Sequence, residues 1–92
     1  MRIVKELTIE DIHVVIFKME QKFTLKLEWN RIEQVFKLDV RDGVSSVEDV
    51  LVLIDESFIQ RARSIFNEMN ENKYVRLAAV QDLGGEEFPE II

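Results

Sequence analysis

The chain has 92 residues, enough for one hydrophobic core but not for two, so the sequence predicts a single domain. Hydrophobic residues make up 47% of the chain and charged residues 33%, which is typical of folded rather than disordered proteins. The formal net charge of −6 opposes general nucleic-acid binding, and the absence of cysteine excludes disulfides, thiolate nucleophiles and cysteine-ligated metal sites.

The charge is divided unevenly along the chain. Residues 1–41 hold eight Lys or Arg and seven Asp or Glu, whereas residues 42–92 hold four and eleven. The first six residues contain no apolar block of signal-peptide length, and no later run approaches the length of a membrane span. We therefore expect a cytoplasmic protein with a near-neutral first half and an acidic second half.

The sequence pattern of the first half of the chain predicts strands. Residues 3–7 fit a short strand, which leaves open whether the sheet has three strands or four. Residues 13–19 are rich in β-branched and aromatic side chains, and residues 23–29 alternate apolar with polar, which makes them the clearest strand in the chain. A third clear strand is predicted at residues 32–40, so that the strands form an antiparallel meander.

A three-residue loop at positions 20–22 would set the register between the two central strands. It places Phe17 opposite Leu25, so that apolar residues meet on one face. The predicted apolar face of the sheet consists of Phe17, Leu25, Leu27, Phe36 and Leu38.

The sequence pattern of the second half of the chain predicts helices. The segment from Ser45 to Glu48 has the spacing of a capping box, so a helix should begin near Ser46. Apolar residues then recur at helical spacing, although residues 50–54 are wholly apolar and a buried strand is the competing interpretation. Asp55 can cap a second helix, whose apolar stripe continues to Met69.

The two asparagines of the segment Asn70-Glu71-Asn72 predict a kink or break in that helix, because asparagine competes for backbone hydrogen bonds. Residues 74–83 fit either a helix or a last strand, and we favour the helix. Gly84 and Gly85 should stop it. The sequence thus predicts an α+β domain at residues 1–83, with two or three helices packed on one sheet face, and a mobile acidic tail at residues 84–92.

No catalytic, cofactor or metal signature is recognisable in the sequence. His13 is the single histidine, and histidine-based catalysis needs partners that one sequence does not reveal. The carboxylates Asp39 and Asp42 before Gly43 lack the spacing of a calcium loop and fit a polar turn. We therefore expect a protein that is not an enzyme and that carries no cofactor.

Three lysines, Lys18, Lys26 and Lys37, are predicted to project from the sheet face opposite the apolar one. They could contact an anion, an RNA or an acidic partner. Glu28, Glu33 and Asp39 should share this face. The competing interpretation is an ordinary face of mixed charge that discourages sheet aggregation.

Four apolar residues are candidates for partner binding. Trp29 ends its strand and could mark an interface. The residues Phe88, Ile91 and Ile92 stand in an otherwise polar tail that could dock into a groove of a partner or a second subunit.

Three segments carry a resemblance to known sequences: residues 23–28 (FTLKLE), 33–37 (EQVFK) and 58–62 (FIQRA). Together they look like a group of small bacterial proteins of unknown function, over roughly residues 3–80. The resemblance implies a bacterial source and a helix after Ser46. It implies no activity, cofactor or site.

Two functions follow as hypotheses. The first is a non-enzymatic protein–protein interaction module that forms a homodimer, suggested by the small core, the open sheet edges and the apolar tail residues. The alternative is a small-ligand or nucleic-acid binding module that uses the lysine-bearing sheet face.

Overall fold

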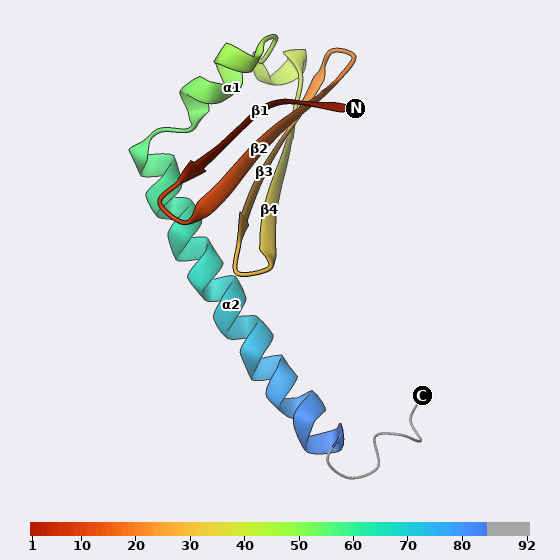
Figure 1. The fold of residues 1–92 in the computed structure, drawn as a ribbon, viewed down its shortest axis with the longest axis vertical. Coiled ribbons are helices and arrows are strands. Elements are labelled where there is room, and N and C mark those ends of the chain that lie inside the picture. Colours follow the sequence, from red (N-terminus) through yellow and green to blue (C-terminus); the bar gives the residue numbers. More distant parts are fainter. Residues whose placement is uncertain (85–92) are drawn as a thin grey trace.

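The protein has an α+β fold, as predicted, in which a four-stranded antiparallel sheet is followed by helices (Figure 1). The computed structural model describes the backbone of residues 1–84 and the side chains of residues 1–81. Its elements, in chain order, are β1 (Arg2–Ile9), β2 (Ile12–Met19), β3 (Lys22–Trp29), β4 (Ile32–Leu38), the 3-10 helix η1 (Val40–Asp42), α1 (Val47–Leu53) and α2 (Glu56–Gly84). The residues around 3–7 thus form a full strand, and the sheet is a meander in the order β1-β2-β3-β4.

Two-residue turns at positions 10–11, 20–21 and 30–31 connect the strands. The first residue of each turn has a positive φ: 59° at Glu10, 58° at Glu20 and 54° at Asn30. At the third turn Arg31 also has a positive φ, of 66°. Positive φ at both central residues suits the twist of a hairpin, but a residue with a Cβ adopts it at a cost of about 1–2 kcal/mol.

The pairing of β2 with β3 differs from the predicted register by one residue. Ile16 lies opposite Leu25, where the prediction placed Phe17. The prediction was wrong because the connection has two turn residues, 20–21, and Lys22 already belongs to β3.

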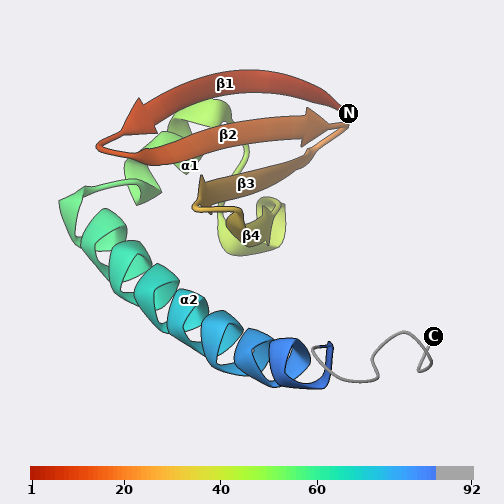
Figure 2. The ribbon, with the colours of Figure 1, turned by 60° about the horizontal axis from the view of Figure 1, so that its bottom comes forward.

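A shift of one residue exchanges the two faces of a strand. Val14 and Ile16 are therefore fully buried on the same face as Leu25. Phe17 lies on the opposite face and is only half-buried, so its prediction as a core residue was wrong. We call the face that carries Phe17 the open face, because α1 and α2 both pack on the other one (Figure 2).

The core lies between the sheet and the helices. It consists of Ile12, Val14, Ile16, Phe23, Leu25, Leu27, Ile32, Val44, Val50, Ile59, Ala62 and Phe66. Phe36 and Leu38 lie at its margin on the covered face, and the Phe36 ring is 5.6 Å from that of Phe58. The prediction that helices cover one apolar sheet face is therefore confirmed, with the residues of β2 corrected.

Local capping sets where the helices begin. The Ser46 hydroxyl accepts a hydrogen bond from the Asp49 N–H at 3.2 Å, so α1 begins after Ser46 as predicted. The reciprocal partner is Asp49, whose carboxylate accepts from the Ser45 N–H at 2.9 Å, rather than the predicted Glu48. Asp55 caps α2 by accepting from the Phe58 N–H at 2.8 Å.

The helix α2 runs for 29 residues, so no break occurs at positions 70–72 and the helical interpretation of residues 74–83 is confirmed. At 1.5 Å per residue it is about 43 Å long, whereas a strand of eight residues spans about 26 Å. The molecule measures 53 × 27 × 22 Å, because the helix extends beyond the sheet (Figure 1). Within residues 1–84 no helix combines the length and the hydropathy needed to cross a membrane.

Candidate interaction surface

The first half of α2 is bound to the sheet by apolar and polar contacts. Ile59, Ala62 and Phe66 are buried, and Gln34 of β4 donates its side-chain N–H to the Ala62 carbonyl at 2.9 Å. Farther along, the side-chain amide of Asn30 donates to the Asn70 side-chain oxygen at 2.8 Å. Asn30 is in the turn between β3 and β4, so this bond marks the point where the sheet ends beneath the helix.

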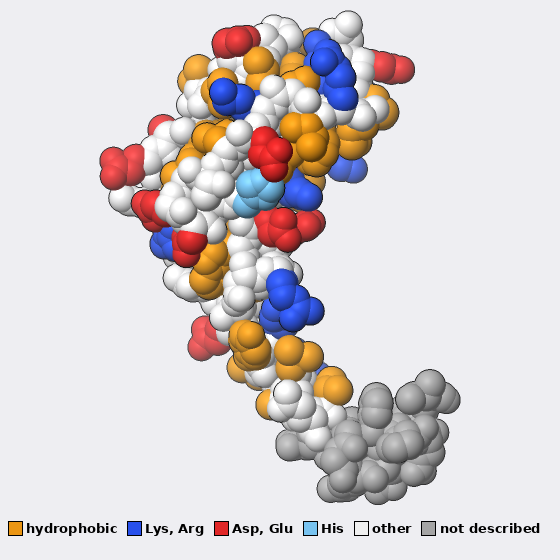
Figure 3. All heavy atoms as spheres, viewed as in Figure 1, with side chains coloured by type: hydrophobic (Ala, Val, Ile, Leu, Met, Phe, Trp, Pro, Cys, Tyr) orange, Lys and Arg blue, Asp and Glu red, His pale blue; other side chains and the backbone are white. Residues whose placement is uncertain are grey.

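The apolar stripe of α2 does not end there. Buried residues recur at steps of three and four along the helix, and Leu77 and Val80 continue the series beyond Asn70. We call residues 71–81 the overhang. In Figure 3 its hydrophobic side chains lie at the surface of the lower part of α2.

Four large apolar side chains of the overhang are exposed to solvent: Tyr74 by 55%, Val75 by 63%, Leu77 by 37% and Val80 by 49%. Ala78 and Ala79 widen the apolar surface between them. A helix that is apolar around most of its circumference is normally buried. The overhang thus presents a surface suited to a partner, with none supplied by the described part of its own chain.

The charges of the overhang nearly cancel. Between positions 71 and 81 the helix carries Glu71, Lys73 and Arg76, a formal charge of +1. The Lys73 ammonium lies over the Tyr74 ring, 5.4 Å from its centroid. Two copies of this segment would therefore meet with little electrostatic repulsion, although the whole chain has a net charge of −6.

Trp29, predicted as a partner-binding residue, makes its contacts within the chain. Its ring packs 5.9 Å from that of Phe66, and its Nε1 donates to Asp11 Oδ2 at 3.0 Å. Asp11 also accepts from Arg63 Nη2 at 2.8 Å. The Arg63 hydrogen bond, followed by that from Trp29, holds the pKa of the Asp11 carboxyl below its usual value. This cluster fastens the turn between β1 and β2 to α2.

The three predicted lysines do not share one face. Lys26 and Lys37 lie on the open face, but Lys18 lies opposite Phe23 and so on the covered face, which makes that part of the prediction wrong. The cause is again the one-residue shift of β2. Lys26 is 3.8 Å from Glu33, and its ammonium lies 5.6 Å from the Phe17 ring centroid.

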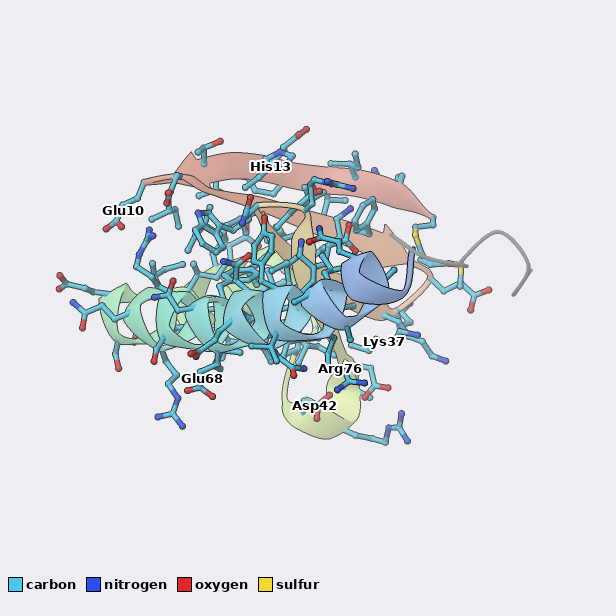
Figure 4. All side chains as sticks on the ribbon, turned by 90° about the horizontal axis from the view of Figure 1, so that it is seen from below. Glu10, His13, Lys37, Asp42, Glu68 and Arg76 are labelled. Atoms are coloured by element: carbon cyan, nitrogen blue, oxygen red, sulfur yellow. The ribbon has the colours of Figure 1, made fainter. Side chains whose placement is uncertain are left out.

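His13 also lies on the open face, away from α2 (Figure 4). Its Nε2 is 2.6 Å from Glu6 Oε2, and both side chains are about half exposed. Within the described part of the chain no three His, Asp or Glu side chains gather in a way that could hold a metal ion. Asp39 and Asp42, considered as a loop-like carboxylate pair, cap η1.

The remaining predicted partner-binding residues, Phe88, Ile91 and Ile92, lie outside the described residues. The sequence analysis did not single out Tyr74, Leu77 and Val80 as a surface. Their spacing was visible as a continuation of the helical repeat, but nothing in a repeat tells where the sheet beneath it stops.

No protein-family model, curated protein or solved structure matched this chain.

Proposed function

We propose that this protein is a non-enzymatic protein–protein interaction module that forms a homodimer through the overhang of α2. The observation that carries the proposal is the continuation of the core stripe beyond the sheet, where Leu77 and Val80 have no strand of the described residues beneath them. Most helical stability in proteins comes from packing of an apolar face, so a partner that buries the apolar side of the overhang would stabilise it.

A second copy is the occupant that fits best. Most homo-oligomers are two-fold symmetric dimers, in which the same patch serves both subunits. If two overhangs pair antiparallel with the axis near Leu77, Tyr74 of one copy lies beside Val80 of the other. The near-neutral charge of the segment favours this self-pairing.

The contact is small, which sets the expected affinity. Eleven residues form about 17 Å of helix, and a pair of such segments lies at the low end of interface sizes. We therefore expect a dissociation constant in the range of about 1–100 μM.

Sedimentation equilibrium of the full chain tests the proposal. The apparent mass should rise with concentration from 10.9 kDa towards twice that value. The double variant Leu77→Glu/Val80→Glu should remain monomeric at all concentrations, because it places charges in the contact. A control on α1, Val52→Glu, makes the same kind of change at a side chain that is 75% exposed and should dimerise like the wild type.

Two results would overturn the proposal. One is a wild-type chain that stays at 10.9 kDa up to about 500 μM. The other is a Phe88→Ala/Ile91→Ala/Ile92→Ala variant that loses the dimer while Leu77→Glu/Val80→Glu keeps it. That second result would assign the contact to the tail rather than to the overhang.

A further inference from the structure

A recess on the open face lies where β2, β3 and β4 approach η1. Two rows of paired strand residues form its floor. The first row is Phe17, Thr24 and Lys37, and the second is Met19 and Lys22. The recess has a volume of ≈ 470 Å³. That lies within the range of about 300–1,000 Å³ usual for small-molecule sites.

The carboxylates at the rim of the recess, Asp39 and Asp42, accept hydrogen bonds within η1 and its cap. Asp39 accepts hydrogen bonds from the Arg41 backbone N–H at 2.9 Å and from Arg41 Nη2 at 2.8 Å. The Arg41 side chain is the main cause that holds the pKa of Asp39 below its usual value, and the charge of Lys22 adds to the effect. Asp42 accepts from the Asp39 N–H at 3.0 Å. Both acids thus serve to hold η1 in place.

The two lysines of the floor, Lys22 and Lys37, differ from these two carboxylates in their ion pairing. Among the described side chains, no ion pair within 4.0 Å involves Lys22 or Lys37. Lys37 and Asp42 both line this recess. Two lysines thus line the recess beside Phe17 and Met19.

We infer that this recess binds a small amphiphilic anion, namely an organic carboxylate with an apolar chain. Lys22 and Lys37 supply charge-assisted hydrogen bonds for the carboxylate. Phe17 and Met19 supply the apolar wall for the chain, and a thioether side chain adapts to ligands of different shape. The site involves none of the overhang and is independent of dimerisation.

Titration of the ¹⁵N-labelled full chain with octanoate, followed by NMR, tests the site. The amide signals of residues lining the recess, such as Thr24 and Lys37, should shift and saturate. The double variant Lys22→Gln/Lys37→Gln should weaken binding by about tenfold or more, because it removes both charges. Lys5→Gln makes the same change at an exposed lysine of β1 outside the recess lining, and it should change the affinity by less than about twofold.

Octylammonium has the same apolar chain with the opposite charge, and it should bind at least about tenfold more weakly than octanoate. The inference fails if octanoate gives no saturable shifts up to about 10 mM. It also fails if octylammonium binds equally well, or if the double variant binds octanoate like the wild type while keeping the wild-type shift of the core Phe66 amide. None of these results bears on the mass measurements that test the dimer.

Discussion

The two halves of α2 carry the same apolar repeat and differ in what lies against it. Up to Asn70 the repeat faces the sheet, and its central residue Phe66 is 1% exposed. Beyond Asn70 the repeat faces solvent, and Leu77 is 37% exposed. Both halves are helical, but among the described residues only the first half buries large apolar side chains against the sheet and so stabilises the monomer by burial.

The largest expected effect separates these halves directly. Phe66→Ala should lower the free energy of unfolding by about 3–5 kcal/mol, because it leaves a cavity beneath the Trp29 ring. Leu77→Ala should lower it by less than about 1 kcal/mol at a concentration where the chain is monomeric. Urea unfolding followed by circular dichroism measures both. Equal losses would show that the overhang is packed within the monomer.

A smaller effect is expected at the one buried polar side chain in the described core, Gln34, which is 9% exposed. Gln34→Ala removes its hydrogen bond to the Ala62 carbonyl and should cost about 1–2 kcal/mol of unfolding free energy. Lys37→Ala, an exposed change on the same strand, should cost less than about 0.5 kcal/mol. If both variants unfold at the same urea concentration, the link between β4 and the first half of α2 is not stabilising.

A stabilising change is expected in the turn between β3 and β4. This turn contacts α2 at Asn70, the boundary between its two halves. Arg31→Gly should raise the free energy of unfolding by about 0.5–1 kcal/mol, because glycine adopts the positive φ of 66° without the steric cost that arginine has. Thermal unfolding measures the gain. Gln21→Gly in the preceding hairpin is the control: position 21 is not among the positive-φ residues, and the variant should lose stability.

The smallest expected effect is on the pH dependence of stability, through the pair of Asp11 with Arg63 in the first half of α2. The pKa of Asp11 is lowered in the folded chain, mainly by its hydrogen bond from Arg63, from the ordinary value of 3.8. The ionised carboxylate therefore stabilises the fold above pH 3.8, and this contribution is lost as the pH falls through the lowered pKa. In Arg63→Gln the Asp11 titration followed by NMR should move up towards 3.8, and the stability should depend less on pH in acid. An unchanged titration would mean that the pair does not form in solution.

Much of the fold could be predicted from the sequence. The alternation from Phe23 to Trp29, the cap at Ser46 and the helical repeat after Asp55 each predicted the element that forms there. The candidate sites could be predicted less well. A single extra residue in the assumed loop at positions 20–22 moved Phe17 into the predicted core and Lys18 onto the lysine-bearing face. Phe17 in fact lies among the lysines of the open face, where it helps to line the recess.

The sequence by itself determined the kind, order and capping of the elements, because these depend on side-chain patterns and hydrogen bonds between near neighbours. Only the tertiary structure decided which face of β2 is buried, because that depends on a one-residue choice in the turn and a strand has a period of two. The structure likewise decided that Leu77 and Val80 lie beyond the sheet, because this follows from the length of α2 compared with the strands. It also brought Lys22 and Lys37 to one recess, through pairing between strands that no local pattern encodes.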